Sequence, residues 1–134
     1  RNVRRISMAV DAVILSDKSF ETVVKVTTTG TNSAASIVDA SALEGAASNP
    51  RLSIVACQWT TGSQTNILFD ASSDDVALSL NGNGAYNVGS QQMPPVPNPG
   101  SSGATGDILL TNGSASVGTI WLKLRKVSGY NNLQ

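Results

Sequence analysis

The sequence predicts an all-β protein: a single-domain β-sandwich, jelly-roll-like, with about eight antiparallel strands. Apolar residues recur at every second position and seldom at helical spacing. Short clusters of Gly, Asn, Ser and Asp separate these runs, as turns separate strands. With 134 residues the chain is long enough to bury a core without disulfides, so we expect residues 1–134 to form one domain.

The predicted strands are the segments in which apolar and polar residues alternate between turn signals. They span residues 5–15, 19–28, 51–60, 65–69, 76–80, 85–88, 107–111 and 118–127. Between the fifth and sixth of them, the sequence Asn81-Gly82-Asn83-Gly84 is typical of a tight hairpin turn, because Asn and Gly adopt positive φ angles readily. We expect this turn to connect two neighbouring strands.

Two segments interrupt the alternation. Residues 36–47 are predicted either to remain irregular or to hold one or two helical turns, with Ser41 as N-cap, Glu44 completing a capping box and Gly45 ending the helix. Residues 91–106 contain four of the five prolines, which excludes a central strand and predicts a semi-rigid, extended Pro/Gly-rich excursion. A loop of this length is either a functional element or a connector between sheets.

The final strand has two clearly different faces. Ile120, Leu122 and Leu124 share one face, which we expect to point into the core. The opposite face carries Thr119, Trp121, Lys123 and Arg125. In the strand 51–60, Trp59 likewise falls opposite the best apolar set. Each tryptophan is predicted either to pack in the core or to serve as an outward anchor for a partner.

Most catalytic arrangements cannot be built from these residues. Histidine is absent, which removes the most common general base and neutral metal ligand. The single cysteine, Cys57, excludes an intrachain disulfide and a structural zinc site, and we expect it to be a small buried hydrophobe. We therefore predict no catalytic residues and no cofactor, in a protein that is not an enzyme.

Carboxylates are the remaining source of chemistry. A glycosidase needs a pair of them in a cleft, but most of the nine acidic residues lie beside Ser, Gly or Asn, where Asp ordinarily caps turns. Residues 70–75 (DASSDD) supply either oxygen ligands for calcium or an Asx-turn between two strands. Their spacing is not that of the helix-loop-helix calcium loop, so we predict no metal site.

Basic residues are concentrated at the two ends of the sequence. Six of the nine Lys and Arg lie in residues 1–5 and 123–126, where they form either one basic face or scattered solvated charges on edge strands. A net charge of zero and only 4% aromatic residues argue against nucleic-acid binding. Docking onto an acidic protein surface is therefore the favoured use of a basic face.

The overall composition suits a subunit packed among neighbours. Only 13% of the residues are charged, so much of the surface must be Ser, Thr, Asn, Gln and Gly. No run approaches the about 20 apolar residues of a membrane span, and the first five residues lack the apolar run of a signal peptide. We expect no membrane partner.

Part of the sequence resembles small virion proteins of tailed bacteriophages, of the capsid decoration or cement type. The resemblance rests on residues 67–82 (ILFDASSDDVALSLNG), the Pro/Gly-rich loop, residues 106–111 (GDILLT) and residues 121–126 (WLKLRK). It extends over about residues 51–127 and consists of a similar pattern of strand and turn residues, without a catalytic motif. Such proteins are encoded beside capsid genes, especially in marine phages.

The resemblance implies a structural subunit on the outer capsid surface of the virion, often a trimer, that bridges neighbouring major capsid proteins. Many weak, repeated contacts with that partner stabilise a shell without chemistry. We expect these contacts on the N-terminal arm, the Pro-rich loop and the outward face of the final strand. The residues are Arg1, Arg4, Arg5, Met93, Pro94, Pro95, Pro97, Trp121, Lys123 and Arg125. The alternatives are a tail spike or fibre head, a carbohydrate-binding module, or a collar or connector component.

Overall fold

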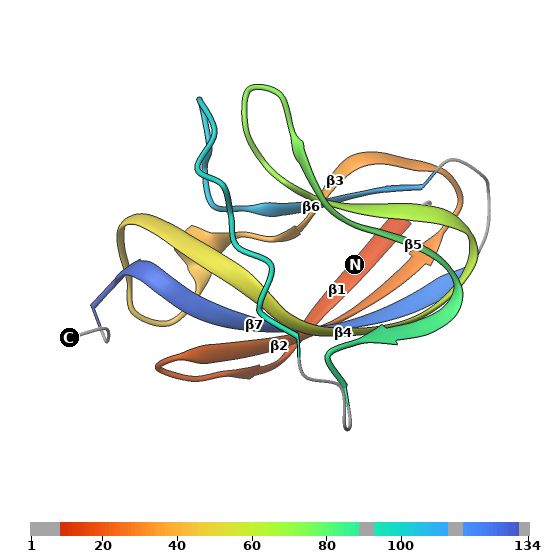
Figure 1. Ribbon diagram of the computed structural model, residues 1–134, viewed down its shortest axis with the longest axis horizontal. Coiled ribbons are helices and arrows are strands. Elements are labelled where there is room, and N and C mark those ends of the chain that lie inside the picture. Colours follow the sequence, from red (N-terminus) through yellow and green to blue (C-terminus); the bar gives the residue numbers. More distant parts are fainter. Residues whose placement is uncertain (1–8, 89–92, 113–116, 132–134) are drawn as a thin grey trace, which may run out of the picture.

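The prediction of an all-β protein is confirmed by the computed structural model, which describes residues 9–88, 93–112 and 117–131 (Figure 1). These residues form seven strands and one short 3-10 turn. The elements are β1 (Ala9–Asp17), β2 (Glu21–Thr29), β3 (Asn32–Val38), η1 (Ala40–Ala42), β4 (Ala46–Phe69), β5 (Asp75–Tyr86), β6 (Ile108–Asn112) and β7 (Gly118–Tyr130).

All strands belong to one curled antiparallel sheet. Its order is β1-β2-β7-β4-β6-β3, and β5 pairs with β4 beside this path. The 24-residue strand β4 organises the sheet, because it pairs with β7 along its first part and with β6 along its last part. The sheet curls so far that its two edge strands, β1 and β3, come close to each other.

One hydrophobic cluster fills the inside of the curl. Strands β2 to β7 and the η1 region all contribute fully buried side chains. The inward face predicted for the final strand is confirmed, because Ile120, Leu122 and Leu124 are each 0% exposed. Their neighbours Val24 and Val26 of β2 lie in the same layer, opposite Leu122 and Ile120 respectively. Burial of these aliphatic side chains is the main stabilising contribution to the fold.

The predicted hairpin turn at residues 81–84 is wrong, because this segment runs inside β5. Gly82 lies opposite Thr61 and Gly84 opposite Trp59, so the strands predicted at 76–80 and from residue 85 are parts of one long strand. A Cβ atom at Gly84 would lie 2.5 Å from Cζ2 of Trp59. Glycine is therefore required here for close packing beneath an aromatic ring, as glycines in strand interiors often are.

The predicted strands 51–60 and 65–69 are likewise parts of one strand, β4. Residues 61–64 stay extended through an irregularity in the pairing with β5. A second irregularity lies between Ile54 and Ala56, where β4 has one residue, Val55, more than its partner β7. Such a bulge reverses the inside and outside faces of the strand beyond it. Cys57 is therefore buried, as predicted, and Trp59 packs against the core, which is one of the two alternatives predicted for it.

Two further local predictions differ from the structure. Strand β3 was not predicted, because its sequence NSAASIV is mostly small and polar and lacks clear alternation. The helical turn near residue 41 is only the three-residue η1, and its N-cap is Asp39 rather than Ser41. The Asp39 carboxylate accepts hydrogen bonds from the backbone N–H and the hydroxyl of Ser41. A short side chain that bonds its own backbone in this way favours a turn over a longer helix.

The Pro-rich segment lies against β4 without forming a strand of its own. Val96 exchanges two backbone hydrogen bonds with Ile54, of 2.8 and 2.9 Å. The Tyr86 hydroxyl donates to the Pro94 carbonyl at 2.6 Å, and the Asn87 side chain donates to the Val55 carbonyl at 2.8 Å. These contacts cover the edge of β4 in the stretch that β5 does not reach. Figure 1 shows this segment crossing in front of β4.

Candidate protein-docking face

The side of the sheet that faces away from the core carries three of the predicted contact residues, Trp121, Lys123 and Arg125. We call it the outer face and define it by the outward side chains of three neighbouring strands. These are Glu21, Val23 and Lys25 of β2, Trp121, Lys123 and Arg125 of β7, and Val55, Ala56 and Gln58 of β4. Backbone pairing sets their spacing, with Trp121 lying between Lys25 and Gln58.

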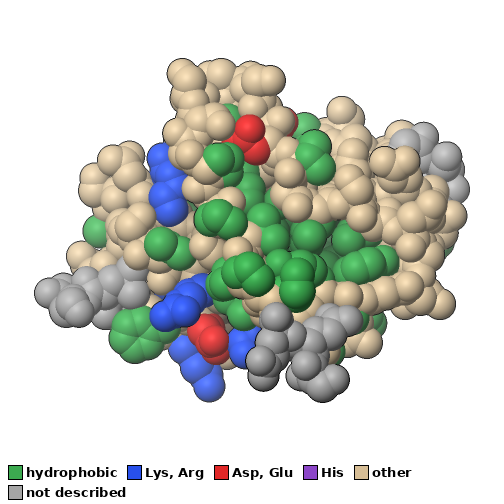
Figure 2. Space-filling model, in the orientation of Figure 1, with side chains coloured by type: hydrophobic (Ala, Val, Ile, Leu, Met, Phe, Trp, Pro, Cys, Tyr) green, Lys and Arg blue, Asp and Glu red, His purple; other side chains and the backbone are tan. Residues whose placement is uncertain are grey.

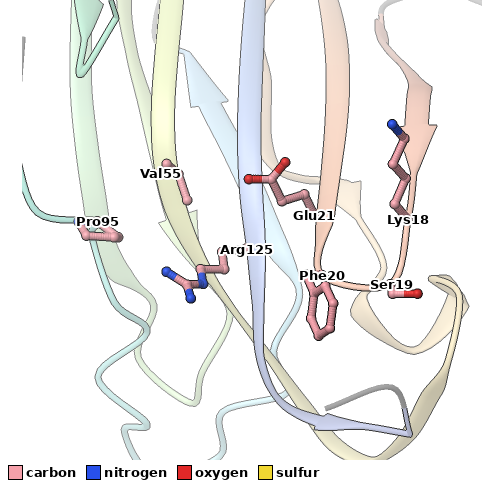
Figure 3. A pocket seen from close by; sticks show the side chains of 7 residues that line it. All are labelled: Lys18, Ser19, Phe20, Glu21, Val55, Pro95 and Arg125. Carbon is pink, nitrogen blue, oxygen red and sulfur yellow. The ribbon is translucent and has the colours of Figure 1, made fainter. Parts of the chain in front are cut away.

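A groove of about 740 Å³ opens at one end of the outer face. Four separate parts of the chain meet there: the β1–β2 turn with the start of β2, the bulge of β4, the Pro-rich segment and β7. The lining residues are Lys18, Ser19, Phe20, Glu21, Val55, Pro95 and Arg125. Figure 3 shows Arg125 projecting between Pro95 and Phe20, with Val55 beside it. The groove thus combines the apolar side chains of Phe20, Val55 and Pro95 with charged ones, among which Arg125 lies opposite Glu21 of β2.

A smaller hollow of about 170 Å³ adjoins the groove on the outer face. Its lining is almost wholly apolar and includes Val23, Ala56, Val88 and the exposed ring of Trp121. Lys123 borders it. The groove and the hollow are neighbours, because Val55 lines one and Ala56 the other. The two depressions therefore lie close together on the outer face, and concave surfaces of this kind receive a partner's side chains.

Charge on the outer face is only partly neutralised within the molecule. Lys123 Nζ lies 3.7 Å from Glu21 Oε2, and both side chains are about half exposed. Arg125 forms no ion pair with any described residue. Figure 2 shows hydrophobic side chains gathered across the middle of the molecule, with basic and acidic side chains together at lower left. The unpaired guanidinium above an apolar groove favours a ligand that carries a carboxylate beside an apolar group.

The structure brings together some of the predicted contact residues and separates others. Pro95 and Arg125 line the same groove, and Trp121 and Lys123 line the adjoining hollow. The other predicted residues of the Pro-rich segment are exposed but line neither depression; they are Met93, Pro94 and Pro97. Arg1, Arg4 and Arg5 lie outside the described residues.

Sequence reasoning missed the apolar half of the groove. Phe20 is 56% exposed in the β1–β2 turn. A large aromatic residue at a turn is unusual and could have indicated an exposed contact site from the sequence alone. Val55 is exposed to the groove only because of the bulge in β4, which no alternation pattern reveals. The hypothesis of one basic face is wrong for Lys126, whose side chain is completely buried on the core side of β7.

Other candidate sites from the sequence have structural roles. Burial raises the pKa of the Cys57 thiol to about 12, so it is not a reactive thiolate. In the segment 70–75, Asp74 accepts a hydrogen bond from the backbone N–H of Ala71, and Asp70 accepts one from the Thr105 hydroxyl at 2.7 Å. Asp74 thus bonds the backbone within the connection between β4 and β5, although it accepts from a preceding residue and not from a following one as in an Asx-turn. Among the described residues, no three His, Cys, Asp or Glu side chains are grouped as a metal site requires.

Near this turn, Asp107 accepts a hydrogen bond from the backbone N–H of Ala40 at 2.9 Å. Its pKa is raised by burial, and the negative charges of Asp39 and Asp70 raise it further against the lowering effect of that bond. The carboxylate thus holds the start of η1 in place. We assign it a structural role.

Comparison of the chain with protein-family models, with curated protein sequences and with solved structures gave no match. Within the described parts of the chain, no helix has the length and hydropathy of a transmembrane segment. The outer face, with its groove and hollow, is therefore the feature on which a function can be argued.

Proposed function

We propose that this chain is a structural protein of a phage virion, a decoration or cement subunit that docks on the outer capsid surface and reinforces contacts between major capsid proteins. In this proposal the curled sheet is a jelly-roll-like sandwich, and its outer face is the surface that contacts the capsid. The observation that carries the proposal is the concave apolar surface flanked by the unpaired Arg125.

The shape and chemistry of the groove support a protein partner. A groove of about 740 Å³ is large enough for several side chains of an extended segment. The backbone at all three apolar residues is held in place: Val55 lies within β4, Pro95 precedes the Val96 bridge to Ile54, and the Phe20 carbonyl accepts a hydrogen bond from the Lys126 N–H at 2.8 Å. A fixed backbone limits the conformational entropy lost when a partner binds. Interfaces of this kind depend on a few aromatic and Arg side chains at their centre.

The groove also specifies what the capsid segment should look like. Two described cations line the groove, Lys18 in the β1–β2 turn and Arg125 in β7, and neither forms an ion pair with a described residue. Because Arg125 projects between Phe20 and Pro95, a capsid Asp or Glu fits beside it (Figure 3). An aliphatic or aromatic residue next to that carboxylate would fill the space between Phe20 and Pro95. Repeated over a capsid, many such modest contacts would stabilise the shell through avidity.

The first experiment measures binding to purified capsids that lack this protein, by co-sedimentation over a concentration series. Arg125→Glu should weaken binding by about tenfold or more, because it places a second negative charge against the expected carboxylate. Lys25→Glu is the matched control, since Lys25 also lies on the outer face but lines neither depression. It should change binding by less than about twofold.

Two outcomes would overturn the proposal. If the wild-type chain does not sediment with capsids at all, the virion role is wrong; selective binding of glycans would instead indicate a recognition module built around the exposed Trp121. If wild type binds but the Arg125 and Lys25 variants lose affinity equally, the groove is not the contact. Quantitative mass spectrometry of particles provides an independent check, because a capsid-reinforcing subunit should approach the major capsid protein in copy number.

A further inference from the structure

Asn87 follows directly after β5 with a backbone conformation that few residues adopt. Its φ angle is 61°, in the left-handed region that glycine enters readily and most other residues avoid. Asn tolerates this region better than most side chains, but the conformation persists only where surrounding contacts hold it. Residues held in this way are concentrated at binding and active sites. The position therefore has a requirement that continuing the strand does not explain.

The side chain of Asn87 holds two separate parts of the chain. Its Nδ2 donates to the Val55 carbonyl at 2.8 Å, and its Oδ1 accepts from the Met93 N–H at 2.9 Å. Val55 is the extra residue of the bulge and lies opposite no residue of β5 or β7, so the amide supplies a donor that the sheet does not. Both ends of the amide are used, which fixes its orientation. One side chain thus joins the bulge of β4 to the Pro-rich segment.

These contacts reach both depressions of the outer face, although Asn87 itself lines neither. Val55 lines the groove, and so does Pro95, two residues after Met93. Val88, the residue that follows Asn87, lines the hollow. The left-handed backbone of Asn87 and its two hydrogen bonds therefore act on the groove and on the hollow together.

We propose that Asn87 is a positioning residue of the docking face: it holds one wall of the groove and one wall of the hollow in the arrangement that a partner recognises. This role rests on the proposed function for one of its two readouts, capsid binding. Preorganised walls reduce the ordering that binding would otherwise require, so affinity should fall when they are released. Because Asn87 acts through the walls of the groove, its effect on binding should depend on Arg125.

Capsid co-sedimentation of two variants tests this role. Asn87→Gly keeps the backbone conformation and removes both hydrogen bonds, so it should weaken binding by about fivefold or more. Asn87→Asp keeps the acceptor for Met93 but places an oxygen against the Val55 carbonyl, and it should weaken binding at least as much. Asn49→Gly is the matched control, because Asn49 has a φ of 54° in β4 and lines neither depression. It should change binding by less than about twofold.

Combination with Arg125→Glu shows whether the loss passes through the groove. Asn87→Gly should weaken binding less in the Arg125→Glu background than in wild type, because the effects of residues that serve one contact are not additive. Equal losses in the two backgrounds, or wild-type binding by both Asn87 variants, would overturn the positioning role. An equal loss in Asn49→Gly would also overturn it, since any left-handed Asn would then have the same effect.

A fluorescence measurement tests the same role without capsids. In the Trp59→Phe background Trp121 is the single tryptophan, and it lines the hollow together with Val88. Asn87→Gly should raise the iodide quenching of Trp121, whereas Asn49→Gly should leave it unchanged. Raised quenching in a chain that does not bind capsids would refute the proposed function and support the positioning role. Unchanged quenching would overturn the positioning role, even where the wild-type chain binds capsids.

Discussion

Arg125 and Lys126 are neighbours in β7 and carry the same charge, yet they lie in opposite environments. Arg125 is exposed on the outer face and forms no ion pair with any described residue. Lys126 is completely buried, and its ammonium group donates three hydrogen bonds. The acceptors are Asp17 Oδ1 at 2.7 Å, the Lys18 carbonyl at 2.6 Å and the Glu44 carbonyl at 2.8 Å. All three donors of the lysine are satisfied.

The difference shows that one side of the sheet stabilises the fold, whereas the other side leaves a charged group exposed. Lys126 connects β7 to the end of β1, to the β1–β2 turn and to the segment between η1 and β4. Asp17 is fixed in turn by the backbone N–H of Glu44 and the hydroxyl of Thr22. The cation on the core side is thus fully used by the fold, whereas the cation on the outer face remains available to a partner.

The largest effect is expected at Lys126. Lys126→Met should lower the free energy of unfolding by about 3–5 kcal/mol, because it removes the cation that pairs with Asp17 and the donor to two carbonyl groups. Lys123→Met on the outer face of the same strand is the matched control. Its ion pair with Glu21 is half exposed, so the loss should stay below about 0.5 kcal/mol. Urea titration of both variants measures the difference; equal losses would contradict the division between the two sides.

The two tryptophans provide a second contrast between core and outer face. Trp59 packs against the core above Gly84, so Trp59→Ala should cost about 2 kcal/mol, less than a fully buried Trp. Trp121 is 38% exposed, and Trp121→Ala should cost less than about 1 kcal/mol. Fluorescence quenching by iodide checks the placement in the single-tryptophan variants Trp59→Phe and Trp121→Phe. Stronger quenching of Trp59 than of Trp121 would show the placement to be wrong.

Acid provides a test of the Lys126 network without any substitution. Burial raises the pKa of Asp17, but hydrogen bonds from Lys126, Glu44 and Thr22 and the charge of Lys126 lower it more, so it lies below its ordinary value. A carboxyl group with a depressed folded-state pKa stabilises the protein above its unfolded-state pKa of about 4. That stability is lost as the pH falls through the folded-state pKa. We therefore expect the free energy of unfolding to fall as the pH is lowered through that range, with Asp17 contributing to the loss.

Asp107 should oppose this acid effect. Its pKa is raised by burial, so it destabilises the fold at neutral pH, and protonation relieves that cost as the pH falls. The loss of stability in acid should therefore be shallower than wild type in Asp17→Asn and steeper in Asp107→Asn, measured by urea titrations between about pH 6 and pH 3. Identical slopes in the two variants would show that neither carboxyl group is linked to folding in the way described.

Part of the comparison could be predicted from the sequence. Alternation in the final strand placed Leu122 and Leu124 inside and Arg125 outside, as the structure shows. The same period places Lys126 inside, but its charge suggested a surface position. Buried lysines are rare unless they are paired, and the partners here come from residues 17, 18 and 44, far from β7 in the sequence. Local patterns contain no information about such pairing.

The groove could not be predicted from the sequence for a related reason. Val55 faces it because β4 has an extra residue there, and Pro95 reaches it because Val96 bridges to Ile54. A bulge changes the phase of every residue that follows it, which explains why Trp59 packs against the core although simple alternation puts it on the face opposite Leu52 and Ile54. The sequence indicated Pro95 and Arg125 as separate contact residues, but long-range strand pairing is what places them in one groove.

The smallest effect is expected at Arg125, and it is the most informative about function. Arg125→Ala should change the free energy of unfolding by less than about 0.5 kcal/mol, because the side chain is exposed and forms no ion pair with the described residues. Arg51→Ala is the matched control. Arg51 donates to the carbonyls of Pro50 and Ala104 at 2.9 and 3.0 Å, so its loss should cost about 1–2 kcal/mol. If Arg125→Ala destabilised the fold as much as Arg51→Ala, Arg125 would serve the fold as Lys126 does, and the groove would lose the free cation on which its proposed partner depends.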